Sequence, residues 1–372
     1  MFTYQIKMGE VEVTGWEGPA VERLKVPKSM EDLPVTSIGE WAFSNHRDLE
    51  ELILPEGMKT LGWYALSGCS RLQRIKLPQT LEVLGGSAFK NCSSLKELEL
   101  PGGLQELGPH FLEGCQELSA LALAEDHPHW KVLDGILYTK DGTRLLAAPP
   151  GWNGSFHSPE TLKEIVGEAF WGCKGLDALF LDKSVTYVGN HAFYGCPISE
   201  LTLSESLVGM GEWAFGRGKY LEKVSIPIHQ ELPDEVLSGL RRILEGRTLR
   251  AYQGSSRSME ILFDHRQLQD LLFSYAMGSF QPGPEATGVY REELVRHQDA
   301  IFRKILEVDG VDGLHVMEEL DLVDSDNIHG LLEEASRKQA THCMLYLLEV
   351  QNRRFGLDEG IKGLDDPWDI DF

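Results

Sequence analysis

A repeating pattern of apolar residues runs through the first two thirds of the chain. One full copy lies between Leu72 and Cys92, where a Leu-x-x-Ile-x-Leu segment is followed by Pro, a second apolar pair before Gly85, and Ala-Phe-x-x-Cys. The alternation at the end of the first segment predicts a strand with one buried face. The position three residues before the cysteine recurs along the chain, at Phe43, Leu66, Phe89, Leu112, Phe170, Phe193 and Phe215.

The spacing of these positions predicts a solenoid. It is 23 residues except for one step of 22 and one step of 58, which is one period plus a 35-residue insertion. A unit of this length cannot bury its apolar face alone, so successive units must stack. A glycine follows the second apolar pair in most units, where the coil must turn a corner. These glycines are Gly39, Gly62, Gly85, Gly108, Gly189 and Gly211.

The repeated phrase resembles the BspA-type leucine-rich repeats of bacteria and some protists. The resemblance rests on Val35–Phe43 and its copies, and on the insertion segment Val132–Leu146, whose Lys140-Asp141-Gly142 has the chemistry of a hairpin turn. It implies an α/β repeat fold, a leucine-rich-repeat solenoid of about seven 23-residue units. The solenoid would cover residues 1–228, with an N-terminal cap over 1–34 and a β-hairpin insertion over 124–159.

Five of the six cysteines stand in register with the repeat. Cys69, Cys92, Cys115, Cys173 and Cys196 follow the apolar position by three residues, while His46 and Gly218 replace the thiol in two units. This exchange favours small buried residues over metal ligands, and no Cys-x-x-Cys pair supports zinc. Disulfides between coils are an alternative that requires oxidising surroundings. We expect reduced structural thiols and no metal or cofactor.

Charge narrows the classes of partner. The formal net charge is −23, and acidic residues are in excess in both halves of the chain. Such a field repels nucleic-acid phosphates and anionic lipid, so we expect no nucleic-acid binding. No stretch approaches the 18 or more apolar residues of a membrane span, so we expect no membrane insertion. The first residues lack a basic segment followed by an apolar run, and they alternate like a hairpin over Phe2–Ile6 and Val11–Thr14. We therefore expect a cytoplasmic protein, with a secreted or surface location as the alternative because many relatives in the resembled family are exported.

The outward positions of the strands offer one candidate binding patch. Most carry charges that alternate between neighbouring coils, such as Glu51, Arg74 and Glu97, which is typical of cross-strand pairing on a solvated sheet. A less charged group flanks the insertion, which could overhang it. This candidate protein-binding patch consists of Ala120, Ala122, Ala178 and Phe180.

After Pro227 the repeat stops and helical spacing begins. Helices are predicted from Leu232, over Ser258–Met277 and Arg291–Val308, and as a final pair around Leu331 and Leu345 that faintly resembles an ankyrin unit. We expect a helical domain over residues 229–357 that shields the last coil. Residues 358–372 read as a flexible acidic tail, in which Trp368 and Phe372 could form a short docking motif.

These observations favour a non-enzymatic scaffold that binds a protein partner through the solenoid surface. The first alternative is a secreted or cell-surface adhesin that binds a host protein or glycan. The second is an enzyme whose site lies in the helical domain, near His297, His315 or His329. No nucleophile, phosphate-binding or metal-protease motif supports this second alternative. The Asp126–Trp130 segment, which contains two histidines, is interpreted as a structural turn.

Overall fold

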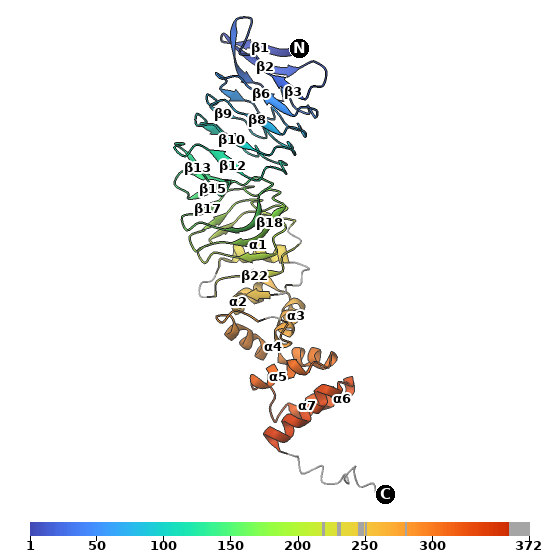
Figure 1. The fold of residues 1–372 in the computed structure, drawn as a ribbon. Coiled ribbons are helices and arrows are strands. Elements are labelled where there is room, and N and C mark those ends of the chain that lie inside the picture. The colour runs from blue at the N-terminus through green and yellow to red at the C-terminus, as the bar shows by residue number, and fades with distance from the viewer. Residues whose placement is uncertain (218–219, 229–231, 245–248, 250, 280, 357–372) are drawn as a thin grey trace. The chain divides into compact units, whose positions relative to one another are not determined.

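The computed structural model describes residues 1–217, 220–228, 232–244, 249, 251–279 and 281–356. Two compact units divide the chain, Met1–Leu244 and Glu245–Phe372. The first is a β-solenoid of about nine turns (Figure 1). The division falls after Leu244 rather than at residue 228, because helix α1 (Asp234–Leu244) belongs to the solenoid unit. Its buried face includes Val236, Leu237 and Leu240, and it packs against β21 (Gly209–Met210).

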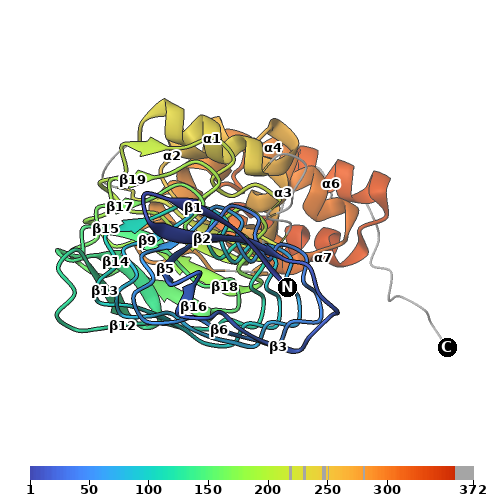
Figure 2. The same ribbon diagram turned by 90° about the horizontal axis from the view of Figure 1, so that it is seen from above.

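Each turn contributes short strands to two columns, in which most neighbouring strands pair in parallel. In Figure 2 the coils are seen along the stack. The first column contains β3 (Arg23–Lys25), β6 (Glu51–Ile53), β8 (Arg74–Lys76), β10 (Leu98–Leu100), β12 (Leu121–Leu123), β16 (Asn153–His157), β18 (Gly175–Phe180), β20 (Glu200–Thr202) and β22 (Lys223–Ser225). The second contains β5 (Leu33–Ile38), β7 (Thr60–Leu61), β9 (Val83–Leu84), β11 (Glu106–Leu107), β15 (Arg144–Ala147), β17 (Glu164–Ile165), β19 (Tyr187–Val188) and β21.

The register of the first column follows the alternation seen in the sequence. Leu52 is aligned with Ile75 inside the coil, while Glu51 is aligned with Arg74 outside it. Arg23 extends the outward row by one coil and forms an ion pair with Glu51. Around β3 the pattern is repeated by Val21, Leu24 and Val26 one coil before the first counted unit, whereas β16 lacks it, so the solenoid has more turns than the seven units counted in the sequence.

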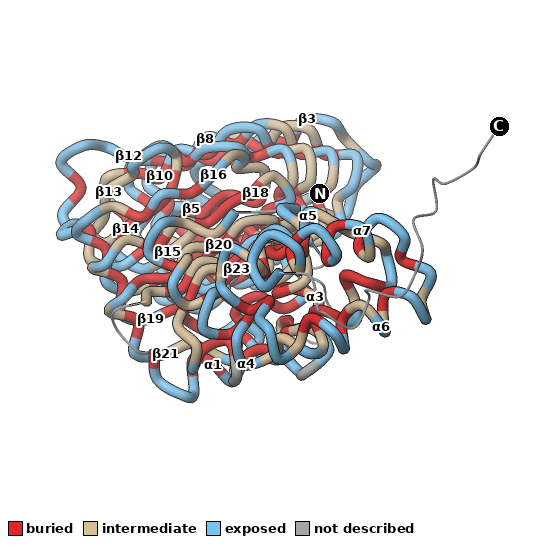
Figure 3. The backbone as a smooth tube through the Cα atoms, turned by 90° about the horizontal axis from the view of Figure 1, so that it is seen from below, coloured by how far each residue is buried: buried red, intermediate tan, exposed pale blue. Residues whose placement is uncertain are grey.

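The interior is built from the repeated phenylalanines and cysteines, and buried residues follow the inside of the coils (Figure 3). The ring centroid of Phe193 lies 5.1 Å from those of both Phe170 and Phe215. Each cysteine of the array is buried and donates its thiol hydrogen to a carbonyl oxygen of the preceding coil, as Cys92 does to Leu66 at 3.3 Å. Burial raises the pKa of the Cys69, Cys115 and Cys196 thiols to about 12. The expected buried, structural position of these residues is confirmed.

Antiparallel strands occur at the N-terminus and in the insertion. The predicted N-terminal hairpin is confirmed as β1 (Phe2–Lys7) and β2 (Glu10–Trp16). Strand β2 pairs in parallel with β5, which joins the hairpin to the second column. A short strand, β4 (Ser29–Met30), pairs with β5. The insertion forms three antiparallel strands, β13 (Trp130–Leu133), β14 (Ile136–Thr139) and β15. Its turn chemistry is as predicted at Asp141, whose carboxylate accepts hydrogen bonds from Thr139 and Thr143, which lower its pKa to about 2.

The second unit is helical. It contains β23 (Ala251–Gln253), α2 (Ser256–Leu262), α3 (His265–Ala276), α4 (Thr287–Glu307), α5 (Val311–Glu319), α6 (Ile328–Lys338), α7 (Thr341–Val350) and the π-helix η1 (Gln351–Phe355). The single helix predicted over Ser258–Met277 is two helices, because Asp264 and Gln267 form a capping box that starts α3. The helices α6 and α7 pack together. The faint likeness of this pair to an ankyrin unit stays a prediction. Within the described residues, no helix is both long and apolar enough to span a bilayer.

Candidate binding site at the interrupted coil

Uninterrupted coils are joined by a regular ladder of backbone hydrogen bonds on the side that follows the repeated glycine. In each coil, alternate N–H groups donate to the carbonyl oxygens of the next coil. Tyr64 donates to Gly86 at 3.0 Å, Leu66 to Ala88 at 2.9 Å and Gly68 to Lys90 at 2.7 Å. The next coil repeats the pattern, with Ser87, Phe89 and Asn91 as donors. Almost all buried backbone groups of a native protein are paired in such ways.

The insertion breaks this ladder after the fourth coil. The chain leaves the stack through β13 and β14, returns through β15, and passes directly from Ala147 into Ala148-Pro149-Pro150. The returning segment pairs with the following coil, since the N–H of Ala148 donates to the carbonyl of Ala169 at 2.7 Å. Leu146 stands at the position of the glycine, and Ala148 and Pro149 take the place of the alanine and phenylalanine of a normal half-coil. The donors of the preceding coil are therefore left without that neighbour.

Three backbone N–H groups face this break. They belong to His110, Leu112 and Gly114, which occupy the positions of Ser87, Phe89 and Asn91 in the coil before. Within the part of the chain that the structure describes, none of these three N–H groups has a hydrogen-bond partner. An edge of this kind presents donors to any chain that can supply carbonyl oxygens.

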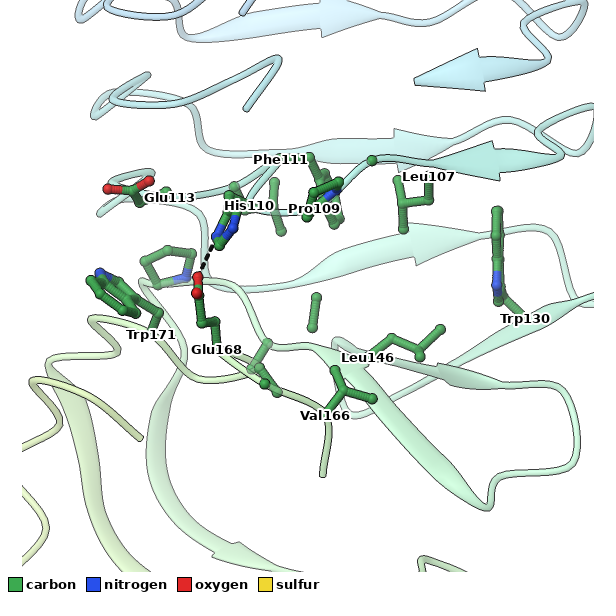
Figure 4. Close-up of a pocket in the computed structure, with 17 residues that line it drawn as sticks. Leu107, Pro109, His110, Phe111, Glu113, Trp130, Leu146, Val166, Glu168 and Trp171 are labelled. Carbon is green, nitrogen blue, oxygen red and sulfur yellow. Dashed lines mark ion pairs between the residues drawn. The ribbon is translucent and has the colours of Figure 1, made fainter. Parts of the chain in front are cut away.

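A cleft of about 350 Å³ opens at the same place (Figure 4). One wall comes from the coil of β11 and includes Pro109, Phe111 and Leu112. The other wall comes from the coil of β17 and includes Val166 and Ala169. Further apolar surface comes from the returning segment and the first insertion strand, and is provided by Trp130, Leu146, Ala147, Ala148 and Pro150.

One ion pair crosses the cleft. His110 Nδ1 from the first wall meets a carboxylate oxygen of Glu168 from the second, as Figure 4 shows. Both residues have a left-handed backbone, with φ of 56° and 62°. Glu113 also lines the cleft and pairs with Lys90 at 2.7 Å. The entrance is therefore polar while the remaining lining is apolar, which is the usual composition of a binding pocket.

His127 holds the start of the insertion and confirms the predicted structural turn. Its side chain is buried and takes the place of Leu104 of the previous coil. Nδ1 accepts hydrogen bonds from the N–H groups of His129 and Trp130, so Nε2 carries the proton and donates to the carbonyl of Leu104 at 3.0 Å. Burial lowers the pKa of His127. The ring also stacks on Trp130, at a centroid distance of 4.8 Å.

The four residues of the predicted patch differ in how far they are exposed to solvent. Ala120 and Ala122 are exposed, Ala178 is buried at 8% exposure, and Phe180 is half-buried against the ring of His157. The patch is therefore smaller than the four residues suggest. Strand β16 is the neighbour of Ala178 and Phe180, so they do not lie directly beside β12. The other two predicted residues, Trp368 and Phe372, lie outside the described residues.

The insertion does overhang the first part of that patch. Gly135, at the turn between β13 and β14, packs so closely on Ala120 that an added Cβ would lie 2.8 Å from the alanine Cβ. The N–H of Leu121 donates to the carbonyl of Gly135 at 2.9 Å. Trp152 Nε1 donates to the carbonyl of Asp134 at 3.1 Å, which fixes the other side of the turn.

The three histidines of the alternative enzyme site have separate surroundings. His297 Nε2 lies 3.7 Å from Glu293 Oε2 within α4. His315 packs on the ring of Tyr346, which donates a hydrogen bond to Glu318. His329 lies on a different helix, α6. Among the described residues, no group of His, Cys, Asp or Glu side chains is arranged to hold a metal ion.

The sequence contained a signal for the cleft that the repeat analysis passed over. The column of glycines is broken at Val166, and the structure aligns Leu146 with it through the pairing of Leu145 and Ile165. At the regular positions a side chain cannot fit, since a Cβ on Gly85 would lie 2.5 Å from backbone atoms of the previous coil. Two consecutive departures from glycine therefore mark the place where the coils no longer press against each other.

Comparison with known proteins agrees with this architecture. Residues 21–129 and 154–243, just over half of the chain, match the model of the BspA type leucine rich repeat region in six copies. The chain belongs to the BspA-type leucine-rich repeat family. The gap between the two matched ranges coincides with the insertion. A search of curated proteins found no match.

Three solved structures illustrate the likeness of the BspA-type chain to other repeat proteins. A leucine-rich repeat protein from Eubacterium ventriosum is 17% identical, with 60% of this chain and 68% of that chain covered and a TM-score of 0.48. The pneumococcal vaccine antigen PcpA is 18% identical, covering 68% and 82%, with a TM-score of 0.45. A protein from Bacteroides ovatus is 22% identical, covering 68% and 66%, with a TM-score of 0.42.

Proposed function

We propose that this chain is a non-enzymatic protein-binding scaffold, and that its partner binds where the insertion interrupts the solenoid. The observation that carries the proposal is the cleft, where three backbone N–H groups lack the neighbour that covers the same edge in other coils. Repeat proteins commonly bind through such extended surfaces, although this argument by itself is an analogy at the level of the fold.

The outward strand surface beside the insertion provides a second part of the proposed interface. Ala120 and Ala122 are exposed there, next to the turn at Gly135. A partner that contacts the insertion could reach this surface as well as the cleft. We therefore keep these two alanines, with Phe180 at its edge, as candidate protein-binding residues.

Crosslinking and capture from the native cell test the proposal with the full chain. The wild type is compared with Ala147→Arg, which fills the cleft, with Ala122→Arg, which changes the strand surface, and with Ala20→Arg, an exposed alanine of the cap. We expect a specific partner that is lost with Ala147→Arg, reduced with Ala122→Arg and retained with Ala20→Arg. A partner captured equally well by all four proteins would contradict the proposal.

A surface adhesin is the second candidate, because large aromatic residues of the solenoid are exposed. Trp41, Trp63 and Trp213 are 54%, 45% and 66% exposed, and Trp41 stacks on Tyr64 at a centroid distance of 4.0 Å. Exposed tryptophans offer contact area to a partner at a low cost in conformational entropy. The prediction of a cytoplasmic location gains no support from the comparisons. Surface labelling of intact cells, together with glycan-array binding by wild type and Trp213→Ala, distinguishes the two candidates.

A further inference from the structure

We propose that the cleft binds a neutral or basic peptide segment of the protein partner, which folds into the turns of a half-coil and completes the interrupted coil. The segment accepts hydrogen bonds from the N–H groups of His110, Leu112 and Gly114. This inference rests on the proposed function and adds the chemistry of the recognised segment.

The other coils show what covers this edge when the stack is intact. The N–H groups of Tyr64, Leu66 and Gly68 meet the carbonyl oxygens of three residues spaced by two, Gly86, Ala88 and Lys90. This covering segment is a series of turns, with a left-handed backbone at Ser87 and Asn91. A bound peptide that folds in the same way offers acceptors at the spacing of the three free donors, and main-chain hydrogen bonds then hold it on the open edge.

The shape of the cleft suits a single peptide segment. Its walls belong to the coils of β11 and β17, and the coil between them is the shortened one that carries Ala147 and Ala148. The cleft therefore takes the place of one half-coil of the regular stack. Leu146, Ala147 and Val166 form an apolar surface on which the peptide can bury an apolar side chain.

Charge selects the class of ligand. Glu113 and Glu168 line the cleft as the partners of Lys90 and His110, and the field around the cleft is that of a chain with a formal charge of −23. A row of N–H groups can also bind a phosphate or carboxylate, but the surrounding negative charge opposes both. Neutral carbonyl oxygens satisfy the same donors without this cost. A basic side chain on the segment adds attraction to the acidic field.

The ion pair between His110 and Glu168 controls access. It joins the two walls across the cleft, so an entering segment must displace it. Opening this solvent-accessible pair costs little, since water competes for both of its groups. Glu168→Gln weakens this closure without removing any backbone donor, and we expect it to raise peptide affinity about two- to five-fold.

A synthetic peptide that copies residues 85–91 of the chain, blocked at both ends, is a suitable probe. It contains the three acceptor carbonyls of a natural half-coil, one apolar phenylalanine and one lysine, and it has no acidic residue. Binding to the full chain is measured by titration calorimetry, and the amide signals of His110, Leu112 and Gly114 are followed by NMR. We expect saturable binding with shifts at these three amides.

Three changes test the mode of binding. An ester in place of the peptide bond that carries the central carbonyl weakens this acceptor, and we expect about ten-fold weaker binding. Replacing the peptide lysine by glutamate should reduce affinity by a similar factor of about ten. Ala147→Arg in the protein should abolish binding, whereas Ala20→Arg should leave it unchanged. Thermal unfolding monitored by circular dichroism shows that both variants are folded.

Several outcomes would overturn the inference. These are no binding at millimolar peptide, binding that Ala147→Arg leaves intact, or tighter binding of the glutamate peptide. A dimer in sedimentation that Ala147→Arg dissociates would identify a second copy as the occupant and would also refute it. If partner capture depends on Ala147 while peptides do not bind, the proposed function stands and only the peptide mode of binding fails.

Discussion

The uninterrupted coils and the interrupted coil present the same row of backbone N–H groups, which is paired in the first and unpaired in the second. Between the coils of Leu66 and Phe89, every second N–H has a carbonyl partner, and glycine allows the backbones to touch. At the insertion the equivalent donors on His110 and Leu112 have no such partner, and side chains replace the glycine. The comparison shows how a solenoid can create a binding site by omitting part of one turn, without changing the turns on either side.

The largest expected difference between the two regions is in core packing. Phe193→Ala removes a buried ring that lies 5.1 Å from Phe170 and Phe215, so we expect a loss of about 3–5 kcal/mol in the free energy of unfolding. Leu112→Ala, beside the cleft, should cost about 2 kcal/mol, because the site is already open on one side. Urea unfolding of both variants measures the difference. Equal losses would mean that the cleft does not loosen its wall.

The glycine column gives the next contrast. A Cβ on Gly85 would lie 2.5 Å from the backbone of Gly62 and Trp63, and backbone atoms cannot move aside as a side chain can. Gly85→Ala should therefore lower the free energy of unfolding by about 1–3 kcal/mol. Val166→Ala, at the equivalent position in the cleft wall, should cost about 1 kcal/mol or less, since its side chain is only half-buried. Thermal unfolding compares the two. If Gly85→Ala is neutral, the coils are not in tight contact there.

The glycine column also shows how far the sequence could predict the molecule. The period, the two strand columns and the cysteine positions follow from repetition, because every unit meets the same neighbours. The cleft could not be found in this way, since it depends on the absence of repetition between Ala147 and Pro150. Likewise, His127 has the role of a leucine only because the N–H groups of His129 and Trp130 need an acceptor, and those positions become visible only when the chain is folded.

His127 predicts a difference in pH dependence. Its pKa is lowered in the folded chain, so the folded state keeps the ring neutral while an unfolded histidine binds a proton below about pH 6.5. The free energy of unfolding should therefore fall as the pH falls through this value, because the unfolded state takes up more protons. His127→Leu, which restores the residue of the neighbouring coils, should remove this part of the acid sensitivity. It should also cost about 1–2 kcal/mol at pH 8, where two N–H groups lose their acceptor.

Urea unfolding between pH 5 and pH 8 measures both effects. The exposed His157 provides the control, since His157→Gln removes a histidine and leaves the buried ring of His127 in place. If His127→Leu retains the wild-type slope, the acid sensitivity arises elsewhere and the neutral, buried state of this ring is refuted.

The smallest expected contrast is in thiol reactivity. Burial raises the pKa of both Cys92 and Cys115, and the thiolate is the form that reacts. Alkylation by iodoacetamide at pH 8 must therefore wait for local opening of a coil. The coil of Cys92 is bonded to neighbours on both sides, whereas the coil of Cys115 faces the cleft on one of them. We expect Cys115 to be alkylated about three to ten times faster than Cys92, as measured by peptide mass spectrometry.

The peptide probe turns this last contrast into a test of the cleft. If a bound segment supplies the missing hydrogen bonds, saturating probe should slow the alkylation of Cys115 toward the rate of Cys92, because opening now requires release of the segment. Cys196, in a coil away from the insertion, should be unaffected. Protection of all three thiols would instead indicate general stabilisation. Equal rates for Cys92 and Cys115 without the probe would show that the open edge does not weaken its coil.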